Sequence, residues 1–379
     1  MLGYGHQYID DSDIQAVVDV LKSDYLTQGP AVEIFEKEIC RITGAKYCVA
    51  VSNATAGLHI AVAALDLDVG TEGITTPNTF LSSANCMVYN GIRPVFADID
   101  SKTYNIDPTE IEKHITDKIK LLIPVHFAGL PCDMERISKI AKGNGLFIIE
   151  DAAHAIGSQY ADGSYVGNCR YSDMTVFSFH PVKTITTGEG GAVTTNDEGL
   201  YKKLLMLRSH GTTKDPELLT ANPGPWYYEM QMLGFNYRMT DMQGALGYCQ
   251  LQKLPFFKKR RRDIVAQYNQ AFGEMKYLKI PYESQKVCSC FHLYVVQIDF
   301  VALGKNRSQV MQELREKGVG TQVHYIPVPS QPYYKKVFGY EACPKAQAYY
   351  EKTLSLPLFS GMSDEDVNLV IDTVKEVVK

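Results

Sequence analysis

The sequence contains no apolar stretch long and pure enough to span a membrane as a helix. Its first segment, residues 1–13, lacks a basic run followed by an apolar one, so we expect no signal peptide. It also lacks an excess of positive charge, and its formal net charge of −5 gives no reason to expect a nucleic-acid partner. No internal repeat or low-complexity segment is present. These absences, with ordinary apolar and charged fractions, indicate a globular protein, which we expect in the cytoplasm.

The nine cysteines follow no metal-binding pattern. They are scattered along the chain, and one close pair, Cys288 and Cys290, has the wrong spacing for a zinc knuckle. An odd number of dispersed cysteines is typical of reduced and mostly buried thiols. We therefore expect no metal site.

Short apolar segments alternate with helical patterns through the first part of the chain. The segments with strand composition are residues 47–52, 73–76, 93–99, 120–125 and 146–150. Repeated strand–helix units predict an α/β fold with a mostly parallel sheet and helices on both of its faces. Because 379 residues are many for one core, we expect a large domain over residues 1–250 and a smaller C-terminal α+β domain over residues 251–379.

The chain is organised around residues 173–196, where two apolar runs flank a polar turn that carries Lys183. Both runs, Met174 to Phe179 and Gly191 to Thr195, have strand composition. A lysine between two core strands loses hydration, which lowers the pKa of its amine and makes the amine nucleophilic. Schiff-base chemistry requires such an amine. For a lysine considered alone, a side chain that reaches out to solvent is the more common interpretation.

An aspartate lies about thirty residues upstream of this lysine, where another apolar run ends. The strand predicted over residues 146–150 leads directly into Asp151. A carboxylate just past the C-terminal end of a buried strand lies where open α/β sheets bind ligands. Pyridoxal phosphate needs such an acid to keep its pyridine nitrogen protonated. The spacing of Asp151 and Lys183 is therefore typical of a pyridoxal phosphate enzyme.

Two segments carry a resemblance to a known family. EDAAHAIG, from Glu150, and FSFHPVKTITTGEGGAVTTND, from Phe177, resemble the sugar aminotransferases of the DegT/DnrJ/EryC1/StrS family, within fold type I of the pyridoxal phosphate enzymes. The resemblance extends over the whole chain. It implies a pyridoxal 5'-phosphate cofactor, with Lys183 as the residue that binds it covalently and moves the proton. Deoxygenating relatives have histidine at this position, so Lys183 favours full transamination.

The same resemblance implies a set of cofactor-binding residues. Asp151 would pair with the pyridinium, His154 would face the phenolic oxygen of the cofactor, and Phe80 would stack on its ring. Small residues between a strand and a helix, as in the segment from Asn53 to Gly57, let backbone amides approach an anion. The phosphate would be bound by Ser178, Thr55 and the backbone of Ala54 and Ala56, with Asn236 reaching it from a neighbouring subunit. A site shared in this way implies a homodimer.

Both ends of the chain extend the resemblance. Residues 4–30, with RSHGTT and VGTQVHYIPV, are similar to the pseudaminic acid branch of the family. Enzymes of that branch aminate carbon 4 of a UDP-linked 4-keto-6-deoxy-N-acetylhexosamine, with L-glutamate as donor. The residues that would line the nucleotide-sugar side are Tyr4, Asp24, Tyr25, Leu26, Thr27, Ala54, Gln322, Val323, His324 and Tyr325. Two of them have ordinary alternatives, since Tyr4 could be a disordered end and His324 a core histidine.

Other functions predict different residues. The aminotransferase of the lipid A aminoarabinose route shares EDAAHA and FSFH but handles a 4-keto pentose, and the LTQGP and QVHY segments favour the pseudaminic branch over it. A dehydratase or a non-catalytic regulator on the same scaffold would lack Lys183 or Asp151. A Rossmann dehydrogenase would need a G-x-G-x-x-G turn after the first strand, where this chain has SNATAG.

Overall fold

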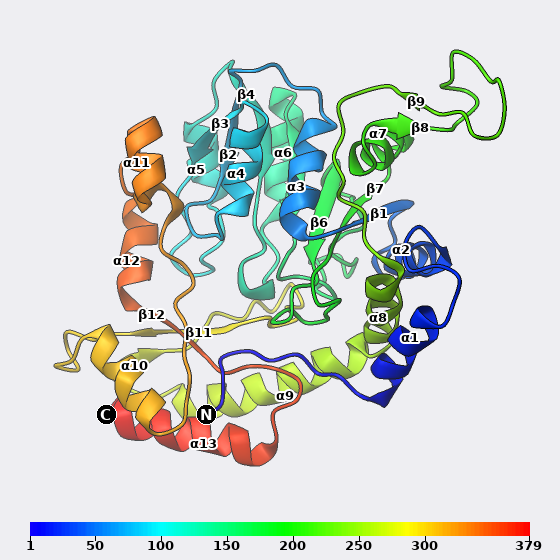
Figure 1. Cartoon of the computed structure of the whole chain (residues 1–379). Coiled ribbons are helices and arrows are strands. Elements are labelled where there is room, and N and C mark those ends of the chain that lie inside the picture. Colours follow the sequence, from blue (N-terminus) through cyan, green and yellow to red (C-terminus); the bar gives the residue numbers. More distant parts are fainter.

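A seven-stranded sheet runs through the larger of two lobes (Figure 1). The computed structural model describes residues 1–379. The strands of this sheet are β1 (Tyr47–Val51), β2 (Glu72–Thr75), β3 (Arg93–Phe96), β4 (Ile119–Ile123), β5 (Phe147–Asp151), β6 (Met174–Ser178) and β7 (Gly191–Thr195). Their order is β1-β7-β6-β5-β4-β2-β3, and β7 runs antiparallel to both of its neighbours while the other pairs are parallel. The predicted α/β fold with a mostly parallel sheet is confirmed.

Helices cover both faces of this sheet (Figure 1). The helices of this lobe are α1 (Asp11–Leu21), α2 (Pro30–Thr43), α3 (Ala54–Ala63), α4 (Ser82–Tyr89), α5 (Pro108–Lys113), α6 (Met134–Asn144), α7 (Glu198–Arg208) and α8 (Asp241–Gln252), of which α1 packs on α8. One apolar layer joins α2, α6 and α8 to the sheet through residues such as Phe35, Ile137 and Leu251. The opposite layer joins α3, α4 and α7 to it, with Met87 and Leu204 among its residues. The sheet is therefore buried on both faces, as parallel sheets generally are.

The smaller lobe contains a three-stranded antiparallel sheet in the order β10-β11-β12 (Figure 1). Its elements are α9 (Leu254–Phe272), β10 (Leu278–Lys279), β11 (Tyr294–Ile298), α10 (Arg307–Glu316), α11 (Pro332–Phe338), α12 (Pro344–Lys352), β12 (Thr353–Leu356) and α13 (Asp364–Val377). A separate apolar core joins α9, α10 and α13 to these strands. The first turn of α9 packs instead in the core of the larger lobe, through Leu254 and Phe257. We propose the domain boundary near residue 250, at the junction of α8 and α9, so that only the first turn of α9 packs back into the core of the larger lobe.

Two peripheral segments matter for the site. At the N-terminus, the Leu2 amide donates to the Gly318 carbonyl at 2.8 Å and the Leu2 carbonyl accepts from the Gly320 amide at 2.7 Å. These bonds fix the arm that carries Tyr4 to the smaller lobe, so Tyr4 is not a disordered end. A hairpin of β8 (Thr212–Thr213) and β9 (Glu229–Met230) extends away from the larger lobe (Figure 1).

Local contacts set several helix boundaries. The first helix begins at Asp11 and is capped by Asp10, whose carboxylate accepts from the amides of Ser12 and Asp13. Helix α12 ends at Lys352, because the next residues pair with β11 as strand β12. The short helix α11 was not predicted, because its aromatic and lysine residues have no clear apolar period.

The basic run at residues 258–262 is not the fully solvated face that its charge suggests. Arg261 is 1% exposed, and its guanidinium donates to the carbonyls of Phe291, His292 and Leu358. Burial lowers the pKa of Arg261 to about 10. Because a guanidinium has five donors, it can join several carbonyl ends at once, and Arg261 thereby ties α9 to the chain around His292.

No helix of the chain combines the length and the apolar composition needed to cross a membrane. No group of three or more His, Cys, Asp or Glu side chains is arranged to hold a metal ion.

Candidate active site

A cavity of about 780 Å³ lies at the carboxyl ends of β5 and β6, where the two lobes meet. Its wall comes from the larger lobe, from the N-terminal arm and from the segment that follows α10. The predicted residues that line it are Tyr4, Ala54, Thr55, Phe80, Asp151, His154, Ser178, Lys183, Gln322, Val323, His324 and Tyr325. Segments far apart in the sequence therefore meet at the edge of the sheet where ligands of such folds bind.

Lys183 lies in the turn between β6 and β7, and its backbone amide donates to the His180 carbonyl at 2.8 Å. Its side chain is part-buried and opens into the cavity. Burial lowers the pKa of Lys183 to about 8, and the negative charge of Asp151 acts in the opposite direction. The amine is therefore neutral in a useful fraction of molecules near neutral pH, as a nucleophile must be.

Asp151 is the last residue of β5 and is 4% exposed. Its Oδ2 accepts from the Ser83 hydroxyl at 2.6 Å, and its Oδ1 accepts from the Ala153 amide at 3.0 Å. Both carboxylate oxygens thus have a donor from the protein, which fixes the plane of the group. The arrangement presents a carboxylate in a fixed orientation to whatever occupies the cavity.

The start of α3 forms a cradle for an anion. Asn53 caps the helix by accepting from the Ala56 amide at 2.9 Å, which leaves the amides of Ala54 and Thr55 in the first turn without an intrahelical partner. Strand β7 passes directly beneath, since a Cβ placed on Gly191 would lie 2.7 Å from the Ala54 nitrogen. The helix dipole and these amides favour a negatively charged group at this end.

Histidines form the wall opposite the lysine turn. The Ala128 amide donates to Nδ1 of His154 at 3.2 Å, so Nε2 carries the proton of the neutral ring and donates to the Tyr325 hydroxyl at 3.1 Å. Burial lowers the pKa of His154 well below its usual value, and the charge of Lys183 adds to this. Burial also lowers the pKa of His324 to about 3, and its Nδ1 lies 2.7 Å from the Ser355 hydroxyl. These rings are therefore neutral and leave Lys183 as the local cation.

Other predicted residues lie outside this cavity. Ala56 is buried within α3, and its amide is engaged by the Asn53 cap. Asn236 is exposed, and so is the segment of Asp24, Tyr25, Leu26 and Thr27. Thr27 pairs with Thr240, and the Leu26 carbonyl accepts from the Asp241 amide at 3.0 Å. The exposed predicted residues therefore flank the start of α8 together, and none of them lines the cavity of their own chain.

Several cavity residues were missed from the sequence. His292 is 3% exposed, packs its ring 4.4 Å from that of His154, and has no hydrogen-bond partner at Nδ1. It was missed because it stands in an apolar run, where a single histidine is typical of a core. Glu189 and His180 also line the cavity. Their place in the sequence could have identified them, since both lie in the turn that carries Lys183.

Comparisons with known proteins agree with this geometry. The model of the DegT/DnrJ/EryC1/StrS aminotransferase family matches residues 7–375. The chain is 43% identical over 381 residues to the spore coat polysaccharide biosynthesis protein SpsC of Bacillus subtilis, covering all of this chain and 97% of SpsC.

Among solved structures, PseC of Helicobacter pylori, an aminotransferase involved in pseudaminic acid biosynthesis, superposes with a TM-score of 0.94 at 31% identity. The match covers 100% of this chain and 99% of PseC. A sugar-aminotransferase-like protein of Streptococcus pneumoniae, Spr1654, solved in PLP and PMP forms, is 32% identical, and its PMP form gives a TM-score of 0.92 over 100% of this chain and 99% of that one.

Proposed function

We propose, from the premise that the chain belongs to the DegT/DnrJ/EryC1/StrS family of pyridoxal phosphate-dependent aminotransferases, that it aminates carbon 4 of a UDP-linked keto sugar. The acceptor would be UDP-2-acetamido-2,6-dideoxy-4-keto-L-arabino-hexose and the donor L-glutamate. The product would be UDP-4-amino-4,6-dideoxy-N-acetyl-L-altrosamine, of the pseudaminic acid pathway. The observation that carries this proposal is the cavity in which Lys183 and Asp151 face Tyr4 and the wall from Gln322 to Tyr325. PseC and SpsC are both named for carbohydrate biosynthesis, which supports a role in a surface glycan.

The residues of the cavity fit the cofactor of the family. The cradle at the start of α3, with the hydroxyls of Thr55 and Ser178, suits a phosphate, and the Asp151 carboxylate suits a protonated pyridine nitrogen. Phe80 is 58% exposed at the rim, where its ring would cover one face of the cofactor. When bound, pyridoxal phosphate supplies an electron sink and a carbonyl group that carries the amino group between substrates.

The chain contributes positioning, proton transfer and exclusion of water. Lys183 would hold the cofactor, and its Nζ would take and return the proton at the reacting carbon. Because burial lowers the pKa of His154 and His324, these rings are weak bases, and the Lys183 amine is the basic group at that position. The wall from Gln322 to Tyr325 would close over the nucleotide sugar from the smaller lobe and orient its keto carbon towards the lysine.

A homodimer with shared sites accounts for the predicted residues that lie outside the cavity. Asp24 to Thr27 and Asn236 are exposed and flank the start of α8. Large apolar side chains are exposed in the same part of the molecule, including Tyr25 at 56%, and on the β8–β9 hairpin, including Trp226 at 68%. Exposed aromatic groups of this size are typical of interfaces. A second copy would bring Asn236 to the phosphate cradle of the first.

Mixing two inactive variants tests the shared site. If Asn236 serves the neighbouring cavity, a dimer of a Lys183→Ala chain and an Asn236→Ala chain has both lesions in one site and neither in the other. Random exchange of equal amounts should restore roughly a quarter of the wild-type activity, since about half of the twofold dimers are mixed. Activity is measured after exchange has been shown independently with tagged chains.

The matched control pairs Lys183→Ala with Asp151→Asn. Both positions line the cavity of the same chain, so every site of the mixed dimer carries one lesion and no activity should return. Recovery in the control, or none in the test pair, would rule out the shared site.

A labelling experiment tests the substrate. The enzyme is incubated with the UDP-linked 4-keto-6-deoxy-N-acetylhexosamine and ¹⁵N-glutamate, and we expect NMR to place the label on carbon 4. A neighbouring carbon would move the reacting centre by about one bond, which spoils near-attack placement. Amination at carbon 3 would overturn the proposal, and a strong preference for a UDP-linked 4-keto pentose would assign the chain to the aminoarabinose route.

A further inference from the structure

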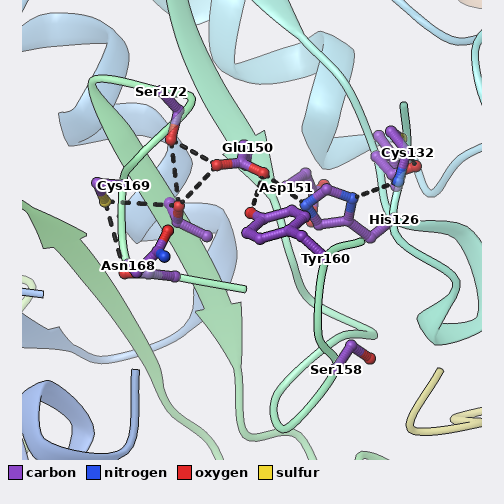
Figure 2. Close-up of polar contacts among 12 residues, drawn as sticks. His126, Cys132, Glu150, Asp151, Ser158, Tyr160, Asn168, Cys169 and Ser172 are labelled. Carbon is purple, nitrogen blue, oxygen red and sulfur yellow. Dashed lines mark hydrogen bonds and ion pairs between the residues drawn. The ribbon is translucent and has the colours of Figure 1, made fainter. Parts of the chain in front are cut away.

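The residue next to Asp151 lies in a buried polar network on the opposite face of β5 (Figure 2). The Glu150 carboxylate is 0% exposed and accepts four hydrogen bonds. They come from His126 Nε2 at 2.8 Å, the Tyr160 hydroxyl at 2.5 Å, the Ser172 hydroxyl at 2.5 Å and the Thr175 hydroxyl at 3.3 Å. We propose that Glu150, acting through His126, is a positioning residue that fixes the Asp151 carboxylate for the cofactor.

His126 connects the two neighbouring residues. Its Nδ1 accepts from the Cys132 amide at 3.1 Å, so Nε2 carries the ring proton and donates to Glu150. Its backbone amide donates to the Asp151 carbonyl at 3.1 Å, and the Asp151 amide donates to the Pro124 carbonyl at 2.9 Å. One histidine therefore holds the side chain of Glu150 and the main chain of Asp151 at the same time.

The network keeps Glu150 charged. Burial by itself would raise the pKa of this carboxyl, but the hydrogen bonds from His126, Ser172 and Tyr160 lower it overall. Burying a charge is costly, and an apolar residue of similar volume often serves stability as well or better. Stability alone therefore does not explain why a carboxylate with four hydrogen bonds lies at this position. The orientation that it imposes on the end of β5 explains it better.

The orientation matters because Asp151 has little freedom of its own. Ser83 and Ala153 hold its carboxylate on the cavity side, while His126 and Pro124 hold its main chain within the sheet. When the hydrogen bond to Glu150 is lost, the His126 ring keeps only its contact with the Cys132 amide, so the residue whose backbone amide donates to the Asp151 carbonyl is held less firmly. Asp151 would then shift relative to the cradle at the start of α3.

A double-mutant cycle tests the proposal, which rests on the role of Asp151 and not on the identity of the sugar. The dissociation constant of pyridoxal phosphate is measured on the apo protein by equilibrium dialysis, and kcat and KM are measured for the glutamate half-reaction. We expect Glu150→Gln to weaken cofactor binding about fivefold or more and to lower kcat about tenfold, with KM for glutamate within about twofold. In the Asp151→Asn background, Glu150→Gln should change both quantities by less than about twofold.

Tyr160→Phe is the matched control, because it removes one donor to Glu150 and leaves the contacts between His126 and Asp151 intact. It should lower Tm but keep kcat within about twofold. If Glu150→Gln does not fold, His126→Asn takes its place in the cycle, since it keeps the backbone amide and loses the ring.

The possible outcomes are distinct. The inference is overturned if Glu150→Gln causes equal losses in both backgrounds, or if Tyr160→Phe lowers kcat as much as Glu150→Gln does. Either result would mean that the network stabilises the fold without positioning Asp151. A loss below tenfold in Asp151→Asn alone would instead reject the role of Asp151.

Discussion

Replacing Lys183 with alanine should abolish turnover, with a loss of at least about 10⁴-fold, or ~5.4 kcal/mol of barrier. In the proposed mechanism the change would remove both the covalent link to the cofactor and the base that moves the proton, and the nearby histidines, whose pKa burial lowers, are too weak as bases to replace it. The cradle at the start of α3 remains, so the variant should still bind pyridoxal phosphate without a covalent bond. Borohydride reduction followed by peptide mapping should place the pyridoxyl group on Lys183 in the wild type and on no residue of the variant.

Lys258→Ala is the control for this experiment. Its Nζ is tied to the Gly157 carbonyl at 2.8 Å and does not line the cavity, so labelling and turnover should stay at wild-type levels. A reducible attachment that survives in Lys183→Ala would assign the covalent link to another lysine.

The pKa of Lys183 adds a pH dependence to the same reaction. With a pKa of about 8, roughly one lysine in ten is neutral at pH 7, against fewer than about one in a thousand at the usual pKa of lysine. Attachment of the cofactor to the apo protein needs the neutral amine, so its rate should rise with pH and level off above about pH 8. Stopped-flow measurement of the visible absorption band would follow this rise.

The sequence predicted those residues of the candidate site that directly follow an apolar segment with strand composition. Asp151 and Lys183 each stand where an apolar strand ends, and in parallel sheets such ends meet at one edge. The segment from Asn53 to Gly57 has the small residues of a strand–helix turn, and its first amides are left open to an anion. For these residues, periodicity and chain direction are enough to bring the side chains together.

The remaining parts depend on contacts that a single sequence does not contain. His292 and Arg261 are buried polar groups whose partners lie in other segments, so neither an apolar run nor a basic run shows their role. The Glu150 network likewise joins residues from several loops to β5. For Asn236, the family resemblance implies a site in the neighbouring subunit. For the segment from Asp24 to Thr27, it indicates a site but does not say which copy contributes the residues.

Replacing Asp151 with asparagine should lower kcat by about 10²- to 10³-fold, or ~2.7–4 kcal/mol of barrier, while the cofactor stays bound. An amide has the same shape but no charge, so it cannot stabilise the proton on the pyridine nitrogen, and the electron sink weakens. The cofactor should stay bound because the cradle at the start of α3 and Lys183 would still hold it, and neither contacts the Asp151 carboxylate directly. Single-turnover measurements with L-glutamate separate this loss of rate from any change in substrate binding.

Ser83→Ala distinguishes the charge of Asp151 from its orientation. The variant removes the 2.6 Å hydrogen bond to Oδ2 but leaves the carboxylate and its contact with the Ala153 amide in place. If the charge is the main contribution, Ser83→Ala should lose no more than about tenfold, and the visible band of the bound cofactor should keep its wild-type pH dependence. In Asp151→Asn that pH dependence should shift, because the ring nitrogen then loses its proton at a lower pH. An unchanged spectrum in Asp151→Asn, with a loss of rate below tenfold, would mean that a different acid holds the pyridinium.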